Sequence, residues 1–272
     1  MGFRAAIQKC RAVCGSLSRV RRSFEELVAE AEAEPIEGWD FSWLEGRATE
    51  DRPSWGYVRS LIPRITKATA ALDIQTGGGE VFAEVLAQAG APKVVAATES
   101  WPPNLVLARR RLSRYGAELA EVADQGELPF PEASFDLVAS RHPTVVVWNE
   151  IARVLAPGGT YFSQQVGSGS NRELTEFMMG TQPVSDRRNP DRASAEAQSV
   201  GLEIVDLRRQ SLQVRFFDIG AVVYFLRKVP WTVPGFNVDR CRARLVAMHD
   251  AIERQGAFVA HAQRFLIEAR KP

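Results

Sequence analysis

The sequence lacks any apolar run long enough to cross a bilayer. A membrane-spanning helix needs about 20 consecutive apolar residues, and the most apolar stretch here, Ile219 to Leu226, is far shorter. The 272 residues are otherwise 45% hydrophobic and 25% charged, which is ordinary for a globular chain that buries its core without disulfides. We therefore expect a protein without a membrane span.

Cysteine and histidine are scarce, with three of each. Cys10 and Cys14 lie one helical turn apart, Cys241 is distant, and no Cys-x-x-Cys pair occurs. No metal site is therefore expected. The odd cysteine number favours a reducing compartment, and hence a cytoplasmic location.

A charge excess of either sign is also missing, because 34 basic residues face 33 acidic ones for a formal net charge of +1. A protein whose main partner is a nucleic acid needs a basic surface, so we expect a small-molecule partner instead. The run Arg109 to Arg111 on a predicted helix could touch RNA phosphates, but a solvated helix face is the commoner reading of such a run. The sequence does not predict an oligomeric state.

Acidic residues are absent from residues 1–22, which carry six arginines and lysines. This composition resembles an organelle transit peptide. The alternative, which we favour, is a frayed basic helix or an early start codon.

From Ala70 onward, short apolar runs alternate with helical stretches. This alternation predicts an α/β fold with a doubly wound, mainly parallel seven-stranded sheet, an antiparallel edge strand and an N-terminal helical cap. The expected strands are 70–74, 93–99, 120–124, 135–141 and 160–166, one or two strands within 201–217, and an edge strand at 264–270. The expected helices in this part are 81–90, 104–116, 148–155, 220–229 and 239–256.

The first 69 residues are expected to form an extension and cap. Ser23 and Glu26 have capping-box spacing and open a predicted helix over 23–34, and a second helix is expected over 57–70 with Pro63 inside it. Residues 70–272 are then predicted to be the ligand-binding domain, with a helical insertion around 219–256.

A glycine loop, Gly77 to Gly79, joins the first strand of this domain to its helix. Ligands of open α/β sheets bind at the carboxyl ends of the strands, and dinucleotide enzymes share such loops. A pyrophosphate, however, would meet Glu80 in the first helical turn, and Phe82 stands where the dinucleotide fingerprint needs Gly or Ala. An NAD-dependent oxidoreductase is therefore disfavoured.

Acidic residues stand at or just beyond successive predicted strand ends, at Asp73, Glu99 and Asp124, with Glu80 opening the helix after the glycine loop. They suit a cationic ligand such as S-adenosylmethionine (SAM), which has a sulfonium and an ammonium group and no phosphate. Glu99 lies 20 residues after Gly79, a spacing at which an acid accepts from ribose hydroxyls. Helix capping or a solvated loop is the alternative for each acid taken alone.

Four stretches of the chain resemble class I SAM-dependent methyltransferases, particularly the small-molecule group related to quinone-biosynthesis C-methyltransferases. These stretches are LDIQTGGGE (72–80), VVAATES (94–100), VADQGELPFPEASFDLVASRH (122–142) and EIARVLAPGGTYFSQQV (150–166). The family usually has glycine where this chain has Gln75, so a side chain there would narrow the loop or contact SAM.

The resemblance implies a SAM site at the ends of the first four strands. Asp73 and the glycine loop would hold the methionine part, Glu99 the ribose, Asp124 and Gln125 the adenine, and Ser140 and Arg141 would line the pocket near the methyl group. The full expected cofactor-binding set is Asp73, Gln75, Thr76, Gly77, Gly79, Glu99, Ser100, Asp124, Gln125, Ser140 and Arg141.

His142 is the first candidate for a catalytic base and for a substrate contact, because it follows the fourth strand at the expected pocket mouth. It precedes Pro143, which favours an extended backbone. His261, expected just before the last strand, is a second substrate candidate.

Aromatic residues cluster before the first strand of the domain, and a lid over the substrate is one interpretation of them. The other interpretation is core packing. The cluster is Trp39, Phe41, Trp43, Trp55 and Tyr57, of which Trp55 and Tyr57 are the substrate-binding candidates. Phe216, Phe217, Tyr224 and Phe225 are expected either to form the opposite wall or to fill the core.

The predicted function is transfer of a methyl group from SAM to a small metabolite by in-line displacement. An RNA methyltransferase and a SAM-binding protein without activity remain as alternatives, because the resemblance brings no obligatory catalytic residue.

Overall fold

The computed structural model describes residues 22–36 and 41–272. Residues 1–21, with Cys10, Cys14 and most of the basic segment, lie outside the described part, as does Trp39. Within it, no helix is both long and apolar enough to span a membrane.

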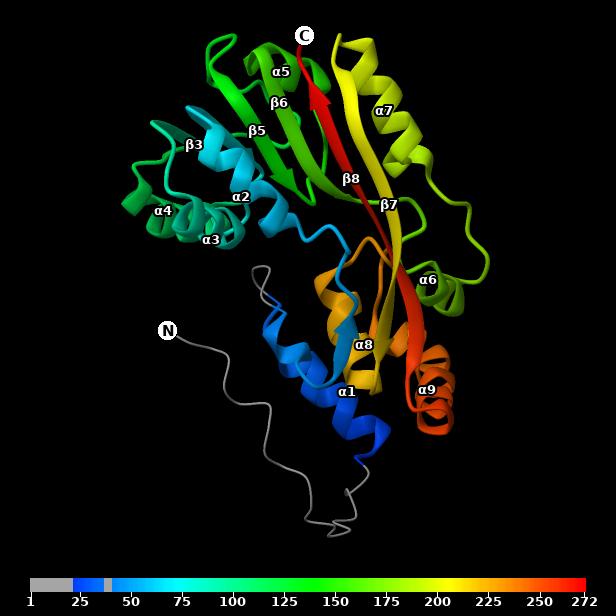
Figure 1. Cartoon of the computed structure of the whole chain (residues 1–272). Helices are drawn as coiled ribbons and strands as arrows, with labels where there is room; N and C mark the ends of the chain where they lie inside the picture. Colours follow the sequence, from blue (N-terminus) through cyan, green and yellow to red (C-terminus); the bar gives the residue numbers. More distant parts are fainter. Residues whose placement is uncertain (1–21, 37–40) are drawn as a thin grey trace, which may run out of the picture.

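The described chain forms one mixed sheet with helices on both faces (Figure 1). The strands are β1 (Ala48–Glu50), β2 (Ala70–Ile74), β3 (Val94–Glu99), β4 (Glu118–Glu121), β5 (Phe135–Arg141), β6 (Leu155–Val166), β7 (Glu203–Phe216) and β8 (Phe258–Arg270). The α-helices are α1 (Phe24–Ala33), α2 (Tyr57–Lys67), α3 (Glu80–Ala89), α4 (Pro102–Leu112), α5 (Trp148–Val154), α6 (Arg172–Met179), α7 (Pro190–Ser199), α8 (Ile219–Lys228) and α9 (Val238–Gln255). Three 3-10 turns cover Ser42–Leu44, Ser113–Tyr115 and Asp186–Arg188.

The strand order is β1-β7-β8-β6-β5-β2-β3-β4. Strands β2 to β6 are parallel to their neighbours among themselves, whereas β8 is antiparallel to both β6 and β7. This arrangement confirms a Rossmann-like α/β fold and corrects two details of the expectation. The sheet has eight strands, and the last strand lies inside it between β6 and β7, because β7 pairs along the whole of β8 from Glu203 to Phe216.

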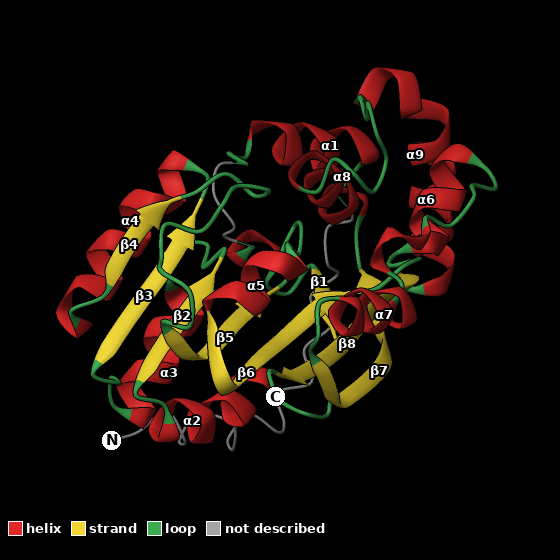
Figure 2. Ribbon diagram, turned by 90° about the horizontal axis from the view of Figure 1, so that it is seen from above, coloured by secondary structure: helices red, strands yellow, loops and turns green. Residues whose placement is uncertain are grey.

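Helices cover both faces of the parallel part of the sheet (Figure 2). Helices α2, α3 and α4 bury Leu61, Phe82 and Leu112 against one face, and α5 and α7 bury Ile151 and Ala197 against the other. We call this part, with β2 to β6 and the ends of β7 and β8 beside them, the parallel half. Its two apolar layers cover the faces of the parallel strands. A ligand site is expected at the C-terminal edge of these strands.

A second core lies beyond the parallel strands, where β7 and β8 continue past them (Figure 1). There residues 212–216 of β7 and 258–262 of β8 pack with α1, α6, α8 and α9, and β1 pairs with β7. We call this part the lower lobe. The segment before residue 70 serves both cores, since α1 and β1 join the lower lobe while α2 covers the parallel half. The domain division at residue 69 stays a prediction.

Local signals explain several of these elements. The predicted capping box at α1 is present, because the Ser23 hydroxyl accepts from the Glu26 amide and the Glu26 carboxylate accepts from the Ser23 amide. Pro63 is accommodated inside α2. The Arg64 guanidinium donates to both oxygens of Glu268 on β8, which attaches α2 to the sheet.

Candidate functional site

The glycine loop links β2 to α3 at the C-terminal edge of the sheet, and its glycines have different roles. Gly77 and Gly79 both have positive φ angles, 65° and 78°. A Cβ at Gly79 would stand 3.2 Å from the Ala108 Cα, whereas a Cβ at Gly77 would meet nothing within 4 Å. Gly79 therefore permits close packing of α4, and Gly77 leaves open space on the side where a ligand would approach.

Glu99, the last residue of β3, fixes the loop through its carboxylate. One oxygen accepts from the Gly77 amide at 2.7 Å, and the other accepts from the Ser100 and Trp101 amides at 3.1 and 3.0 Å. The side chain is almost wholly buried. Because each carboxylate oxygen has two lone pairs, the oxygen that accepts from Gly77 keeps one further lone pair for a ligand hydroxyl.

Asp73 is buried at the end of β2, beside Glu99 and Arg141. Burial raises the pKa of Asp73 to about 7, with Glu99 adding to the rise and the Thr76 side chain and Arg141 opposing it. A buried carboxyl whose charged form is this unfavourable gains free energy when a cation approaches it.

Gln75 occupies the left-handed region with φ of 55°, a conformation that normally favours glycine. Its amide nitrogen donates to the Val145 carbonyl at 2.7 Å, and its amide oxygen accepts from the Thr144 backbone amide at 2.6 Å. The Thr144 hydroxyl also donates to Asp124 at 2.5 Å. The side chain at this unusual position therefore joins the glycine loop to the loop after β5.

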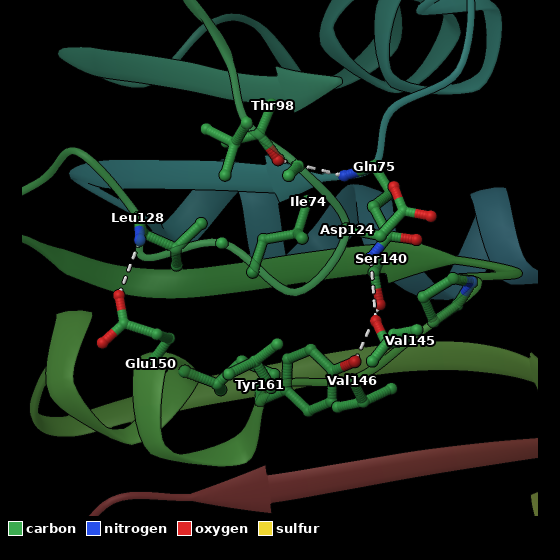
Figure 3. Close-up of a pocket in the computed structure, with 16 residues that line it drawn as sticks. Ile74, Gln75, Thr98, Asp124, Leu128, Ser140, Val145, Val146, Glu150 and Tyr161 are labelled. Atoms are coloured by element: carbon green, nitrogen blue, oxygen red, sulfur yellow. Dashed lines mark hydrogen bonds between the residues drawn. The ribbon is translucent and has the colours of Figure 1, made fainter. Parts of the chain in front are cut away.

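A hollow of about 410 Å³, measured with its open mouth, lies between these loops. Figure 3 shows Gln75, Thr98 and Asp124 on one side and Tyr161 and Glu150 on the other. The Ser140 hydroxyl, at the floor, is 2.8 Å from the hydroxyls of both Tyr161 and Ser163. The floor is thus polar but internally hydrogen-bonded, and the remaining wall is mostly apolar.

Glu150 on α5 holds the loop that closes this hollow. Its carboxylate accepts from the Leu128 amide at 2.6 Å and from the Arg153 guanidinium. The Arg153 hydrogen bond, with smaller help from Leu128, keeps the pKa of Glu150 below its usual value. The charged pair therefore positions residues 124–130 along the edge of the hollow.

A hydrogen-bonded chain of three side chains lies on the face of the sheet that α2 covers. The Trp55 indole donates to the Gln164 amide oxygen at 2.7 Å, and the Gln164 amide nitrogen is 2.8 Å from His142 Nε2. An indole N–H can only donate, so it fixes which way the Gln164 amide points. His142 Nε2 must then accept, and the proton of the neutral ring is on Nδ1.

His142 is held in its neutral form. Burial, together with the charges of Arg141, Arg264 and Arg188, keeps the pKa of His142 well below its usual value. Its φ of 57° is left-handed, so the extended backbone expected before Pro143 is wrong. The backbone instead turns sharply there, because the His142 amide donates to the Gln164 carbonyl at 2.7 Å.

Tyr57, the first residue of α2, is buried with its ring stacked on Phe162 at 5.5 Å between centroids. Its hydroxyl has no hydrogen-bond partner within the described residues. Burial raises the pKa of Tyr57 well above its usual value, Asp73 and Tyr161 raise it further, and the charge of Arg141 opposes the rise. A buried hydroxyl without a hydrogen-bond partner is unfavourable unless a bound ligand supplies that partner.

The structure brings most of the sequence-predicted residues to this edge, but not all of them. Gln75, Asp124 and Ser140 line the hollow, whereas Gln125 is exposed and borders a shallower surface depression. His261 lies inside β8, not before it, and its Nδ1 is 2.6 Å from Glu173 of α6.

The aromatic residues before β2 are divided between the two cores. Trp55 and Tyr57 pack over the parallel half, and Trp43 packs on Tyr224 in the lower lobe. Phe216 and Tyr224 are core residues of that lobe, with Phe225 against them, and Phe217 is exposed.

Glu80 and Arg111 have contacts that the sequence did not predict. Glu80 forms an ion pair with Arg111 at 2.7 Å, so its repulsion of a pyrophosphate is partly compensated. Arg111 also donates to the Gly78 carbonyl at 2.7 Å, whereas Arg109 and Arg110 are exposed on α4 as expected for a solvated helix face.

Thr144, Gln164 and Glu150 were not singled out in the sequence, although each holds a part of the site. The spacing of Glu150 and Arg153 at i and i+3 was a usable signal. Thr144 and Gln164 carry none, because their contacts join distant parts of the chain.

Comparisons with known proteins agree with this geometry. Residues 72–163 match a family described as a methyltransferase domain, and this span contains the glycine loop, Glu99, Asp124 and the hollow. No curated protein sequence matches the chain.

Solved structures with the same fold are distant in sequence. A proposed methyltransferase from Bacillus halodurans C-125 is 16% identical, with 79% of this chain and 98% of that chain covered and a TM-score of 0.54. A functionally unknown protein from Deinococcus radiodurans R1 is 18% identical, with 83% and 91% covered and a TM-score of 0.56. A structure reported for conversion of a disulfide bond into a thioacetal group during echinomycin biosynthesis is 16% identical, with 92% and 93% covered and a TM-score of 0.51. The match over residues 72–163 supports a SAM-dependent methyltransferase, and the solved structures support the Rossmann-like fold.

Proposed function

We propose that this protein transfers a methyl group from SAM to a small metabolite. The observation that carries the proposal is the arrangement of Asp73, Gly77 and Glu99, which places two buried carboxylates around a loop with open space above it. That arrangement suits a ligand with a positive charge and a hydroxyl group. It suits a pyrophosphate poorly, since both carboxylates would repel it.

The described residues fit SAM part by part. Gly77 leaves room for the methionine chain, Asp73 would face its positive charges, and the remaining lone pair of Glu99 suits a ribose hydroxyl. Asp124 and the apolar wall formed by Ile74, Val145 and Val146 suit adenine. Thr76, Ser100 and Arg141 remain predicted contacts, and the present position of Gln125 makes it the weakest member of the predicted set.

SAM, when bound, supplies a methyl group already activated by a sulfonium. The chain therefore has to position the acceptor in line and keep water away. Trp55 and Tyr57 are buried over the sheet face beside Asp73 and support the exclusion of water there. The unpaired Tyr57 hydroxyl is the group we expect to point toward the reacting centre.

We propose a positioning role for His142. The Nε2 lone pair of His142 is occupied by the hydrogen bond from Gln164. His142 can therefore take a proton from the methyl acceptor at Nε2 only if that hydrogen bond breaks. Its Nδ1 proton remains available for donation. His142 would thus orient the methyl acceptor by donating a hydrogen bond to it from Nδ1. A direct substrate contact by His261 is less well supported, because its ring is bound by Glu173.

A small acceptor is favoured over RNA by the near-zero net charge of +1. The likeness to the quinone-biosynthesis group remains a prediction about which metabolite this is, and a SAM-binding protein without activity remains the alternative. Single-turnover transfer of labelled methyl from SAM to components of a cell extract distinguishes them.

The binding proposal is tested by calorimetry with SAM and with NADH. Wild-type protein should bind SAM and not NADH, and Asp73→Ala and Glu99→Ala should each weaken SAM binding strongly while keeping the far-UV spectrum of the folded chain. Unchanged SAM affinity in both variants, or NADH binding in place of SAM, would contradict the proposal.

A further inference from the structure

Three arginines gather around the end of β6, on the acceptor side of the proposed SAM site. The stretch 164–170 is their common scaffold. Arg141 pairs with Gln164 in the β5–β6 ladder, Arg264 pairs with Val166 and donates to the Ser170 hydroxyl, and the Arg188 carbonyl accepts from the Ser168 amide. Each arginine belongs to a different segment of the chain, so only the fold brings them together.

The two strand arginines project from the same face of the sheet. Ala139 of β5 and Leu266 of β8 lie in the core under α2, and side chains two residues apart on a strand share a face. Arg141 and Arg264 are two residues away from these core positions. They therefore project toward the side that carries Trp55, Tyr57 and the Gln164–His142 pair.

The positive charges of the three arginines oppose one another. Burial lowers the pKa of Arg188, and the charge of Arg264 lowers it further. Burial likewise lowers the pKa of Arg264, with Glu50 opposing and Arg141 reinforcing the change. Three positive groups held together and partly desolvated are unfavourable without an anion near them.

The acidic groups in contact with the cluster do not balance it. Glu50 accepts from Arg264 at 2.6 Å, and Asp73 is near Arg141 but has a pKa raised to about 7, so it is only partly ionised at neutral pH. Among the described residues, neither Arg141 nor Arg188 has an ion pair or a side-chain hydrogen bond. At least one full positive charge is therefore left over.

We infer that the acceptor is an anion, a carboxylate or a phosphate monoester, whose charge is bound by Arg188 and Arg264 with Arg141 at the boundary to the methyl donor. The inference rests on the proposed function, since it names the acceptor class of that site. Arginine forks suit both anions, because two parallel N–H groups match two oxygens. The Nδ1 proton of His142 and the unpaired Tyr57 hydroxyl add neutral donors on the same face.

SAM also has a carboxylate that arginines can bind, so the experiment distinguishes binding of the methyl donor from binding of the methyl acceptor. Titration of wild-type protein with S-adenosylhomocysteine tests the donor site first. The complex is then titrated with benzoate, phenyl phosphate and, as a neutral comparison, benzamide. Arg188→Gln is the test variant because Arg188 has no internal partner to lose, and Arg187→Gln is the matched control, with the same change in net charge at the exposed neighbouring residue.

We expect the wild-type complex to bind at least one of the two anions and not benzamide. Arg188→Gln should weaken anion binding at least tenfold, Arg188→Lys less, and Arg187→Gln less than twofold, with S-adenosylhomocysteine affinity within twofold throughout. No binding of S-adenosylhomocysteine by the wild type overturns the proposed function, and this inference with it.

If S-adenosylhomocysteine binds, three results overturn the inference alone. One is that neither anion binds the complex. Another is that Arg188→Gln weakens S-adenosylhomocysteine as much as the anion, which assigns the cluster to the donor. The last is that Arg187→Gln and Arg188→Gln have equal effects, which leaves only a general charge effect.

Discussion

Strands β7 and β8 pass through both parts of the molecule and meet different surroundings in each. In the parallel half β8 lies beside β6, and helices cover both faces of the sheet. In the lower lobe β7 has β1 beside it, and α1, α8 and α9 join the apolar cluster that includes Leu212, Val214 and Phe216. The first environment positions the cofactor residues, and the second attaches to it a lobe built from both ends of the chain.

The two parts share strands β7 and β8 but not their chemistry. The polar groups that we assign to SAM are all in the parallel half, whereas the lower lobe has an apolar cluster of its own, with Lys228 and Thr232 among its few buried polar residues. Mutations in the two parts should therefore separate stability from ligand binding.

The largest effect is expected from a core truncation in the lower lobe. Leu245 of α9 is fully buried, and Leu245→Ala should lower the free energy of unfolding by roughly 3 kcal/mol. Because β7 and β8 connect both cores, we expect one cooperative urea transition shifted as a whole, and unchanged SAM affinity in the folded protein. Two separate transitions would show instead that the lower lobe unfolds independently of the parallel half.

Removal of the Glu99 carboxylate should have the next largest effect. Glu99→Ala leaves the Gly77, Ser100 and Trp101 amides without their acceptor and removes the proposed ribose contact, so calorimetry should show SAM binding weakened about a hundredfold, or about 2.7 kcal/mol. The control is Glu121→Ala, at the exposed end of the neighbouring strand β4, which should bind SAM like the wild type. Equal losses in the two variants would remove Glu99 from the site.

A pH dependence of binding should follow from Asp73. Its pKa of about 7 in the ligand-free protein means that the carboxyl is largely protonated at pH 6 and ionised at pH 8. If the ionised form binds the cationic donor, SAM affinity should fall about tenfold from pH 8 to pH 6. Asp73→Asn should flatten this profile, and a wild-type profile that rises toward pH 6 would contradict the assignment.

The same group affects stability in the opposite direction. Because the folded-state pKa lies above the unfolded value, the folded protein binds the extra proton between about pH 4 and pH 7. The contribution of Asp73 to stability is therefore present at the acid end of this range and decreases as pH rises to 7. His142 does not confuse the binding profile, because its pKa is well below its usual value.

The sequence predicted the parallel half far better than the lower lobe. Apolar runs located β2, β3 and β5 to within a residue of their observed bounds, and the glycine loop with Asp73 and Glu99 located the edge where the site lies. Those signals are local, since each depends on one strand and the turn after it.

Long-range pairing explains what the sequence could not show. The full lengths of β7 and β8 exceed their recognisable patterns because each strand enters a second core, and for that reason His261 was placed before β8 and β8 at the sheet edge. Helices α6 and α7 were not predicted at all. The arginine cluster joins three distant segments, so no local motif could have indicated it.

Gln75 carries the smallest expected effect and tests why this chain departs from the usual glycine. Gln75→Ala keeps the left-handed φ of 55° and loses the hydrogen bonds to Thr144 and Val145, whereas Gln75→Gly loses the same bonds but relieves the backbone, by about 1 kcal/mol. Urea unfolding should therefore rank wild type and the glycine variant close together, with the alanine variant about 1 kcal/mol below the glycine variant. If the two variants are equally stable, the left-handed backbone carries no strain at this position. If the glycine variant also binds SAM more tightly than the wild type, then the side chain restricts the cofactor loop, and its bonds to the loop after β5 serve that restriction and not the binding of SAM itself.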